Sequence, residues 1–454
     1  MAGMEELCQG ASDAAARIGG GIAKGSLFTI VTHTDVDGIS AGTLAFLALR
    51  NQGGKAHLLF SPHVYPEDLV RLLSDDPEFL IFCDMGSDLL PELVKLGRDF
   101  LVLDHHATDN EGENLVNPST VGMDGTRDIS ASGVVYLVAS ALNPVNADLS
   151  HIALCGAFGD MQTLRGANER IANDAESRGL VRRRKEIRLI GRRNRSIEYS
   201  LRYTTLPFIK GLSGNPVGIR NFLKETGVGD DPKKTISELD DDMERVLISN
   251  LAERMVKNNA STFEAEKLFG ATLHVLTGQV PTIEDLVDYI ESCGSLGRYS
   301  TAFALLSGDP GSLEGAERSR LEYKEKILQG VDLFKSAVHL ANIDYLVLEG
   351  WDEYAGKLCG IYANAGFSGH QRPIFTLSLD GSNVKVSART NPRLVDRGLD
   401  LGRALKAISS RFEGSGGGHD VAAGAKIPAK SIEDFVRELD REVGLQLAEE
   451  EVEE

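Results

Sequence analysis

Four apolar segments near the start of the chain end in aspartate or histidine. These segments are Phe28–His33, Phe79–Asp84, Phe100–Asp104 and Leu149–Asp160. Core packing does not explain why carboxylates and imidazoles recur where buried strands or helices end. Such side chains are the oxygen and nitrogen ligands that a two-metal hydrolytic site needs, and rigid elements would hold them in place. The sequence therefore predicts a two-metal site built on the ends of strands and helices.

The first 160 residues alternate between short apolar segments and helical patterns. Segments with the β-branched or aromatic content of buried parallel strands span 28–33, 57–61, 79–84 and 100–104. Helical patterns cover 40–50, 67–73, 89–96, 131–142 and 149–158. This βαβ rhythm predicts an α/β fold with a doubly wound parallel sheet. Ligands bind such sheets at the carboxyl ends of the strands, which is where the aspartates and histidines fall.

The rest of the chain changes character twice. Helical patterns dominate from about 176 to 340, including 243–258, 261–268, 283–293 and 317–342. Strand patterns return at 344–348, 373–378 and 383–388, followed by helices at 401–409 and 432–443. We therefore expect a catalytic domain at 1–175, a mostly helical insertion with a basic segment at 176–340, a smaller α/β domain at 341–445 and an acidic tail at 446–454.

Composition is that of an ordinary soluble protein. The 454 residues are 42% hydrophobic and 25% charged, and no apolar run is long enough to cross a bilayer. No signal-peptide pattern occurs at the N-terminus. The five cysteines are scattered without a CxxC pair, which favours small core thiols in a reducing cytoplasm.

Positive charge is concentrated in one segment, although the net charge of the chain is −19. Between Arg178 and Lys210 lie eleven basic residues and two acidic ones, Glu186 and Glu198. The basic side chains of so dense a cluster repel one another unless a polyanion or an acidic surface neutralises their charge. The segment therefore predicts a track for a phosphate backbone. The alternative is the solvated face of a helix. The arginines that we assign to the track are Arg182, Arg183, Arg184, Arg192, Arg193 and Arg195.

The first group of candidate metal ligands is His33, Asp35 and Asp37. Because they alternate, they share one face of an extended backbone, and Gly38 then permits a tight turn into the next helix. The alternative is a set of incidental polar residues in a strand-to-helix loop. Asp84 could bridge a metal pair with its two oxygens; alternatively it caps the helix at 89–96.

Asp104, His105 and His106 form the most specific pattern. Adjacent histidines on a turn point in different directions, so one can bind metal while the other meets substrate, and Asp104 can orient an imidazole. Asp160 would complete the ligand set. Aspartate and histidine without thiolate suit Mn²⁺ best, with Mg²⁺, Co²⁺ or Zn²⁺ as substitutes, and two such ions would activate a water for attack on a phosphodiester.

A glycine run precedes His419 near the C-terminus. Gly416, Gly417 and Gly418 would let the backbone approach a ligand and offer N–H groups to phosphate oxygens. Arg389, at the end of a predicted strand, could supply a cation to the same phosphate. The alternatives are a flexible linker that ends in histidine by chance and a surface arginine without a ligand.

Taken together, these motifs resemble the DHH phosphoesterase superfamily. His33–Gly38, Asp84, Asp104–His106 and Asp160 are similar to its four motifs. Two further segments, Ser387-Ala388-Arg389-Thr390 and Gly416–Gly424, resemble its C-terminal DHH-associated domain. The insertion, with Arg202–Pro207 and Gly211–Gly214, is similar to that of the archaeal RecJ-like exonucleases, a group that includes the nuclease associated with the replication complex GINS.

The resemblance implies a role for each matching residue. The first metal would be held by His33, Asp35 and Asp84, and the second by Asp37, Asp84, His105 and Asp160. His106 would contact the scissile phosphate and Asp104 would orient the histidines. Arg389, His419 and the glycine run would hold a substrate phosphate or the strand end. Bacterial RecJ begins the first motif with aspartate where this chain has His33, and little sequence follows residue 443, so no C-terminal OB-fold is expected.

We therefore expect a metal-dependent exonuclease that acts on single-stranded DNA or RNA. The alternatives are a phosphatase for oligoribonucleotides or 3′-phosphoadenosine 5′-phosphate, and a non-catalytic subunit of a replication complex. An intact ligand set speaks against the last. A catalytic chain that also docks on a GINS-like partner remains compatible with the sequence.

Overall fold

The computed structural model describes residues 2–69, 77–228, 233–367, 369 and 371–449. Contacts divide the chain into two compact units. Unit 1 comprises residues 1–185 and 271–321, and unit 2 comprises 186–270 and 322–454. The second half of the predicted helix 67–73 lies outside the described residues.

Unit 1 contains a five-stranded parallel sheet with the strand order β2-β1-β3-β4-β5. The strands are β1 (Leu27–Thr32), β2 (Lys55–Phe60), β3 (Phe79–Cys83), β4 (Asp99–Leu103) and β5 (Leu115–Val116). The predicted α/β fold and parallel sheet are confirmed. The chain leaves β1 in one direction toward β2 and returns to β3 on the other side, so the order reverses between β1 and β3. Such a switch point opens a crevice at the carboxyl ends of the two strands.

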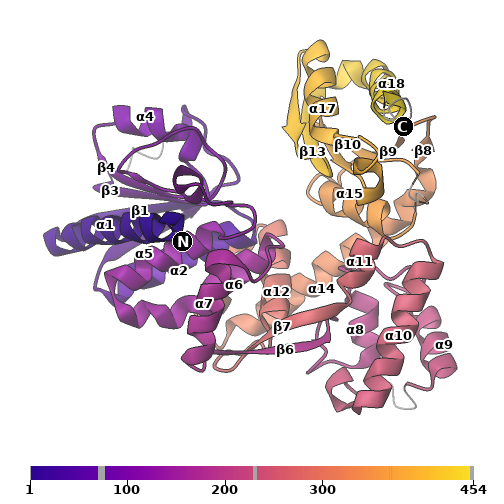
Figure 1. Cartoon of the computed structure of the whole chain (residues 1–454), viewed down its shortest axis with the longest axis horizontal. Coiled ribbons are helices and arrows are strands. Elements are labelled where there is room, and N and C mark those ends of the chain that lie inside the picture. The colour runs from indigo at the N-terminus through magenta and orange to yellow at the C-terminus, as the bar shows by residue number, and fades with distance from the viewer. Residues whose placement is uncertain (1, 70–76, 229–232, 368, 370, 450–454) are drawn as a thin grey trace. The chain divides into compact units, whose positions relative to one another are not determined.

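Helices cover both faces of this sheet (Figure 1). On one face, Ile30, Ile81 and Leu101 join the largest core cluster, together with side chains of the helices that cover this face. Those helices are α1 (Ala2–Lys24), α2 (Val36–Asn51), α5 (Ala131–Leu142) and α6 (Ser150–Gly159). The alternate residues of the strands pack on the other face, against α4 (Leu90–Lys95). This alternation explains the continuously apolar strands, because both faces of a parallel sheet are buried.

The second part of unit 1 returns to α2 and α6. It contains α12 (Ile283–Ser295), α13 (Tyr299–Leu306) and the start of α14 (Ser312–Val331), and α12 packs against α6 and α2. A Cβ atom at Gly294 would lie 2.8 Å from the carbonyl oxygen of Thr34. Only glycine therefore lets α12 approach the loop that carries the first motif.

Unit 2 combines a helical part with a second sheet. The helical part contains α8 (Ile197–Tyr203), α9 (Pro216–Thr226), α10 (Asp241–Lys257) and α11 (Thr262–Glu266). The mixed six-stranded sheet has the order β12-β13-β11-β10-β9-β8. Its strands are β8 (Val338–His339), β9 (Asp344–Leu348), β10 (Ile374–Asp380), β11 (Asn383–Arg389), β12 (Ser415–Gly418) and β13 (Ala422–Pro428). The accompanying helices are α15 (Ala355–Asn364), α17 (Leu401–Ser409) and α18 (Ile432–Glu449).

The compact units differ from the four-part division expected from the sequence. Residues 186–270 belong with the C-terminal sheet and 271–321 with the N-terminal one, so the expected insertion is split. The chain passes between the units within β6 (Val181–Ile187), β7 (Phe269–Val275) and α14. The predicted helix 317–342 is wrong beyond Val331, where a short 3₁₀ turn and β8 follow. The first four residues of the expected acidic tail continue α18 as far as Glu449.

The cysteines match the expectation of core thiols at four positions. Cys83, Cys155, Cys293 and Cys359 are free and buried, and Cys8 is partly exposed. Among the helices that the structure describes, none combines the length and the apolar character needed to cross a membrane.

Candidate metal centre

The six predicted metal ligands meet at the switch point of the unit 1 sheet. His33, Asp35 and Asp37 follow β1, and Asp84 follows β3 in the neighbouring position. His105 follows β4, and Asp160 is the residue at the C-terminal cap of α6. Asp35 is also the N-cap of α2 and accepts a hydrogen bond from the Gly38 N–H at 2.9 Å. Local helix capping therefore fixes where this carboxylate points.

The first cluster consists of His33, Asp35 and Asp84. One ligand atom from each residue lies within 4.8 Å of the other two. The Nδ1 atom of His33 lies 2.9 Å from Oδ2 of Asp35 and 3.5 Å from Oδ2 of Asp84. These three residues could hold one cation.

The second cluster consists of Asp37, His105 and Asp160, and it also lies beside Asp84. The Nε2 atom of His105 lies 3.4 Å from Oδ2 of Asp160 and 3.9 Å from Oδ2 of Asp37. The same nitrogen is 3.4 Å from Oδ1 of Asp84. A second cation could bind here.

Asp84 connects the two clusters. Its Oδ2 faces His33 and its Oδ1 faces His105, as a carboxylate that bridges two metals would. Both oxygens are shielded from solvent and neither has a hydrogen-bond partner among the described residues. The backbone of Asp84 adopts φ +58°, a left-handed conformation that costs free energy for a residue other than glycine. The following 3₁₀ turn is capped by Gly86 rather than Asp84, so helix capping does not account for this carboxylate.

Asp37 is held by the N-terminus of α5. Its two oxygens accept hydrogen bonds from the backbone N–H groups of Ala131 at 2.7 Å and Ser132 at 3.0 Å. These two bonds hold both carboxylate oxygens of Asp37 in a fixed orientation. A Cβ at Gly156 of α6 would lie 2.1 Å from Oδ1 of Asp37, so only glycine allows this approach.

A chain of buried hydrogen bonds orients His105. Its Nδ1 lies 2.7 Å from the carbonyl oxygen of Gly125, which also accepts a bond from Nε2 of Gln162 at 2.9 Å. The Oε1 of Gln162 accepts in turn from Asn168 at 2.7 Å. A carbonyl oxygen can only accept, so Nδ1 of His105 must carry a proton and donate it. In the neutral ring, Nε2 then has the lone pair that a metal ion needs. Sequence reasoning missed Gly125, Gln162 and Asn168, since nothing local links them to His105.

Asp104 orients His106 rather than the ring of His105. Oδ1 of Asp104 lies 2.8 Å from Nδ1 of His106 and accepts from the His105 backbone N–H at 2.8 Å. Oδ2 accepts from the Ser87 N–H at 3.3 Å. The His106 side chain is 61% exposed, so it can reach a substrate, and its Nδ1 is 3.8 Å from Asp84. The two adjacent histidines thus face different surroundings.

The electrostatics of the site favour added positive charge. Burial opposes protonation of His33, yet the nearby carboxylates of Asp35 and Asp84 raise its pKa to about 10. The pKa of His105 is raised to about 11 by Asp84, Asp37 and Asp160, again against the effect of burial. Burial raises the pKa of Asp84 to about 6.

The donor set suits a divalent cation. Four carboxylates stand against two imidazoles in the six-residue group, and burial and the neighbouring Asp37 and Asp35 raise the pKa of Asp160 as well. In the metal-free chain, the excess negative charge of the group is reduced only when its side chains take up protons. Divalent cations would bind the same oxygen and nitrogen atoms and displace those protons. Hard oxygen and imidazole ligands without thiolate fit Mn²⁺ or Mg²⁺.

The second predicted site lies in unit 2, where Arg389 and His419 come to one end of the sheet. Arg389 ends β11 and pairs with Ala422 at the start of β13, while the backbone N–H of His419 donates to the Ala422 carbonyl at 2.8 Å. The glycine run itself forms the edge strand β12. Any Cβ at Gly416 would come within 2.9 Å of α17 and β13, so packing requires this glycine.

Two polar residues next to Arg389 were not predicted. Asn391 is buried, and neither polar atom of its amide has a hydrogen-bond partner among the described residues. The hydroxyl of Thr390 is buried in the same way. Buried polar groups normally have hydrogen-bond partners. The side chains of Thr390 and Asn391 therefore offer unsatisfied donors and acceptors to a ligand at the predicted phosphate site.

The basic segment is divided between the two units. Arg182, Arg183 and Arg184 lie on β6 in unit 1, whereas Arg192, Arg193 and Arg195 follow in unit 2. The helix-face alternative is wrong for the first three, because they form a strand. Arg182 and Arg184 are exposed, and Arg195 lies over the ring of Tyr199 at 5.3 Å.

Arg183 and Arg192 form ion pairs with glutamates of the chain. Arg183 pairs with Glu169 at 2.6 Å and Glu176 at 3.0 Å. Arg192 is buried and pairs with Glu186 and, at 3.2 Å, with Glu244. The assignment of Arg192 to the track is therefore wrong. Its guanidinium is buried, so a nucleic acid cannot reach it, and the two glutamates balance its charge.

Comparison with known proteins identifies the family. Residues 27–157 match the model of the DHH family, N-terminal domain, and residues 342–445 match that of the DHHA1 domain. An uncharacterized protein of Methanocaldococcus jannaschii is 30% identical over 431 residues, which cover 92% of this chain and 93% of the relative. The chain belongs to the DHH family of phosphoesterases. The predicted resemblance is confirmed, and a DHH member with this donor set is expected to hydrolyse phosphate esters.

Solved structures share the DHH fold at low sequence identity. RecJ of Thermus thermophilus in complex with Mn²⁺ has a TM-score of 0.61 and 16% identity, over 96% of this chain and 55% of that one. The chain thus spans about half the length of that RecJ. CDC45 of Entamoeba histolytica has a TM-score of 0.64 and 14% identity, over 97% and 98% of the two chains. A second RecJ structure, described as an exonuclease bound to manganese, has a TM-score of 0.57.

Proposed function

We propose that the chain is a metal-dependent exonuclease for single-stranded DNA or RNA. The position of the Asp84 carboxylate, with one oxygen toward each ligand cluster, is the observation that carries this proposal. Two divalent cations, most suitably Mn²⁺, would supply an activated water and offset the charge that develops on the phosphodiester. The manganese complexes of RecJ support this choice of cation.

The residues of the site would divide the work between them. The first cation would be held by His33, Asp35 and Asp84, and the second by Asp37, Asp84, His105 and Asp160. His106 is exposed and oriented by Asp104, so it is suited to donate a hydrogen bond or proton to a phosphate oxygen. The buried bond from His105 to Gly125 keeps Nε2 directed at the carboxylates.

Substrate binding would use unit 2 and the exposed arginines. Arg389, His419 and the backbone of Gly416, Gly417 and Gly418 would contact a phosphate or the end of a strand. Gly417 has open space around its Cα, which suits a close approach. Arg182 and Arg184 would attract the phosphate backbone, which predicts binding that weakens with salt.

The two alternatives remain distinct proposals. A phosphatase for oligoribonucleotides or 3′-phosphoadenosine 5′-phosphate would need the same metal centre but not the exposed arginines. The second alternative is a subunit that docks on a replication complex of the GINS type; with CDC45 the chain shares its fold. The complete donor set of this chain supports catalysis over a purely structural role.

Five free cysteines are in keeping with the cytoplasmic location that we propose.

The deciding experiment is Mn²⁺-dependent degradation of single-stranded DNA and RNA oligonucleotides labelled at either end. Asp84→Asn removes the bridging charge with little change in shape, and Asp88→Asn is a matched control at an exposed position. Stepwise shortening that is lost only in Asp84→Asn supports the exonuclease. Cleavage limited to very short fragments favours the phosphatase, and an inactive wild-type chain refutes the proposal and favours the scaffold.

A further inference from the structure

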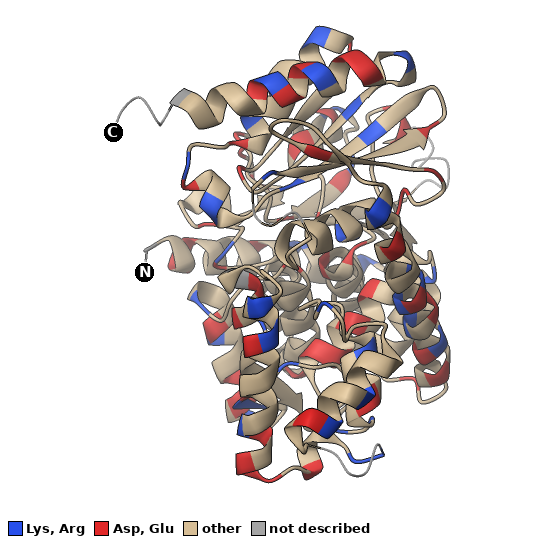
Figure 2. Cartoon of the chain, turned by 90° about the vertical axis from the view of Figure 1, so that its right-hand side faces the viewer, with Lys and Arg blue, Asp and Glu red and all other residues tan. Residues whose placement is uncertain are grey.

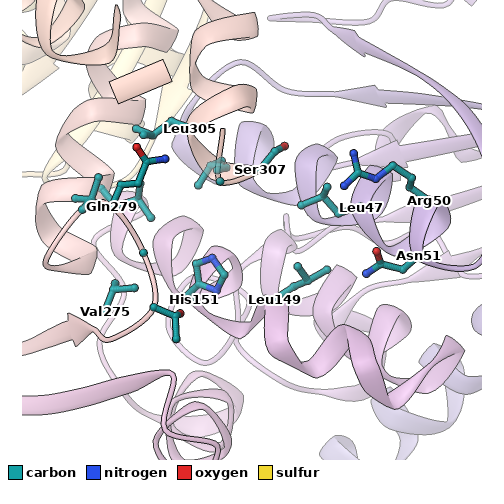
Figure 3. Close-up of a pocket in the computed structure, with 15 residues that line it drawn as sticks. Leu47, Arg50, Asn51, Leu149, His151, Val275, Gln279, Leu305 and Ser307 are labelled. Atoms are coloured by element: carbon teal, nitrogen blue, oxygen red, sulfur yellow. The ribbon is translucent and has the colours of Figure 1, made fainter. Parts of the chain in front are cut away.

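Unit 1 contains a cavity whose lining includes none of the candidate metal ligands. Its volume is about 300 Å³, at the lower end of the range for small-molecule sites. The lining comes from the end of α2, the start of α6, α12, α13 and the segment after β7 (Figure 3). The labelled side chains surround one open space, with those of α2 on one side and Val275 and Gln279 on the other.

The lining is aliphatic with a few polar groups. The apolar walls are formed by Leu47, Leu149, Val275, Val280, Leu286, Leu305 and Leu306. The polar groups are those of Arg50, Asn51, His151, Thr277, Gln279 and Ser307. No aspartate or glutamate occurs among the described residues that line this cavity. The cavity therefore offers an apolar slot beside a single permanent positive charge, that of Arg50.

Two of its polar groups have no partner in the part of the chain that the structure describes. Arg50 is exposed and forms no ion pair with the residues that the structure describes. The hydroxyl oxygen of Ser307 is shielded from solvent and has no hydrogen-bond partner in the same part of the chain. An unpaired buried hydroxyl costs free energy, which a ligand that bonds to it would recover.

The position of the cavity relates it to the metal centre. The helix α2 begins beside Asp35 and Asp37 and ends at Asn51, 16 residues or about 24 Å away. The helix α6 begins at Ser150 beside the cavity and ends next to Asp160. The two helices pack on each other and on α12. A ligand between their far ends thus contacts the same rigid elements that carry three metal ligands.

We propose that this cavity binds a nucleoside monophosphate and that its occupancy alters metal binding at the catalytic centre. The base and sugar would lie against the leucines, the phosphate would pair with Arg50, and Ser307 would bond a polar group of the ligand. The choice of ligand rests on the proposed function, because an exonuclease releases nucleoside monophosphates next to this unit. The cavity would then sense product.

Binding of AMP to the metal-free chain, measured by calorimetry, tests the first part of this proposal. The measurement uses the Arg389→Ala background, which removes the cation of the predicted phosphate site in unit 2. Adenosine and inorganic phosphate serve as partial ligands and should bind at least about tenfold more weakly than AMP. Arg50→Ala should weaken AMP binding by a similar factor, and Ser307→Leu, which fills the cavity, should abolish it.

Arg318→Ala is the matched control, because Arg318 is an exposed arginine of α14 in unit 1 that pairs only with Glu314 among the described residues. AMP binding that is absent, or equal in Arg50→Ala and Arg318→Ala, overturns the site. If Ser307→Leu does not fold, the Arg50→Ala result decides. The second part predicts a change of at least about fivefold in Mn²⁺ affinity when AMP is present, and an unchanged affinity overturns that coupling. A chain without nuclease activity that still binds AMP through Arg50 refutes the proposed function but not the site.

Discussion

The Nδ1 atom of His105 lies 2.7 Å from the carbonyl oxygen of Gly125, 20 residues further along the chain. This one contact decides which nitrogen of His105 faces Asp37, Asp84 and Asp160. A Cβ at Gly125 would lie 1.9 Å from the backbone oxygen of His105, so the approach requires glycine. The geometry of a candidate metal ligand therefore depends on a residue without a side chain.

Gly125→Ala should weaken Mn²⁺ binding by about 10- to 100-fold, the usual effect of losing a partner that orients a ligand. The physical reason is that the added methyl group displaces His105 from the carboxylates. Titration of the purified chain with Mn²⁺ measures the change. Gly112→Ala, in the loop before β5, is the control, since a Cβ there makes an ordinary contact of 3.6 Å with Leu90. Equal Mn²⁺ affinity in both variants would show that the contact does not matter.

His106→Ala should lower kcat by about 100-fold or more while Mn²⁺ affinity changes less than about twofold. Asp84 and His105 lie close enough to His106 to share a metal with it, so this variant separates two roles. A side chain that only meets substrate affects the rate, whereas a ligand affects metal binding. Parallel loss of rate and affinity would make His106 a ligand. Asp104→Asn should give a smaller loss of kcat, because the amide retains a hydrogen bond to His106.

Mn²⁺ affinity should rise as the pH increases from about 6.5 to about 8.5. Neighbouring carboxylates outweigh burial and raise the pKa of His33 to about 10 and that of His105 to about 11 in the metal-free chain, so a cation must displace protons there. The two protonated rings stabilise the metal-free fold fully below pH 6.5, and this contribution is lost as the pH rises toward 10. Titrations at several pH values measure the slope. An Mn²⁺ affinity that does not change with pH would mean that protons and Mn²⁺ do not compete for the two histidines.

Arg192→Ala should reduce the free energy of unfolding by about 3–5 kcal/mol, because it leaves Glu186 buried without its partner. Denaturant unfolding of the whole chain measures this loss. The same substitution at exposed Arg184 should cost less than about 0.5 kcal/mol. Similar losses in both variants would contradict the distinction between a structural and an exposed arginine.

Arg182→Ala combined with Arg184→Ala should weaken binding of single-stranded oligonucleotides and flatten its dependence on salt. Each lost phosphate contact should reduce the slope of log K against log salt by about 0.7 for a single strand. Fluorescence anisotropy at several salt concentrations measures both quantities. Binding and slope equal to those of the wild-type chain would exclude β6 from the interface.

Much of the N-terminal fold and the clustering of the candidate ligands could be predicted because each signal is local. An apolar strand followed by aspartate or histidine places that side chain at the edge of a parallel sheet, as the positions of Asp84 and His105 show. The helix 131–142 and the strand 344–348 have the predicted bounds for the same reason. Alternating polar residues after β1 were enough to point to His33, Asp35 and Asp37.

Features that depend on distant contacts could not be predicted. The basic residues of β6 form a strand because β6 pairs with β7, and no local pattern reveals that pairing. Arg192 looks like its exposed neighbours in sequence, but Glu244 from a later helix pairs with it. Packing against α17 and β13 requires glycine at position 416, and no local pattern reveals those contacts. Sequence separation is the common cause of these errors.

Residues 186–270 lie between the two segments of unit 1 in the sequence, and this order has a consequence for protein synthesis. A nascent chain has all six predicted metal ligands by residue 160, but the helix that packs on the first motif through Gly294 comes only with α12. Domains generally begin to fold on the ribosome as soon as their residues are available. We expect the first part of unit 1 to wait for about a hundred further residues before α12 covers α2. Fragments that stop at residue 185 should therefore contain every predicted ligand and still lack the helix that packs on the first motif.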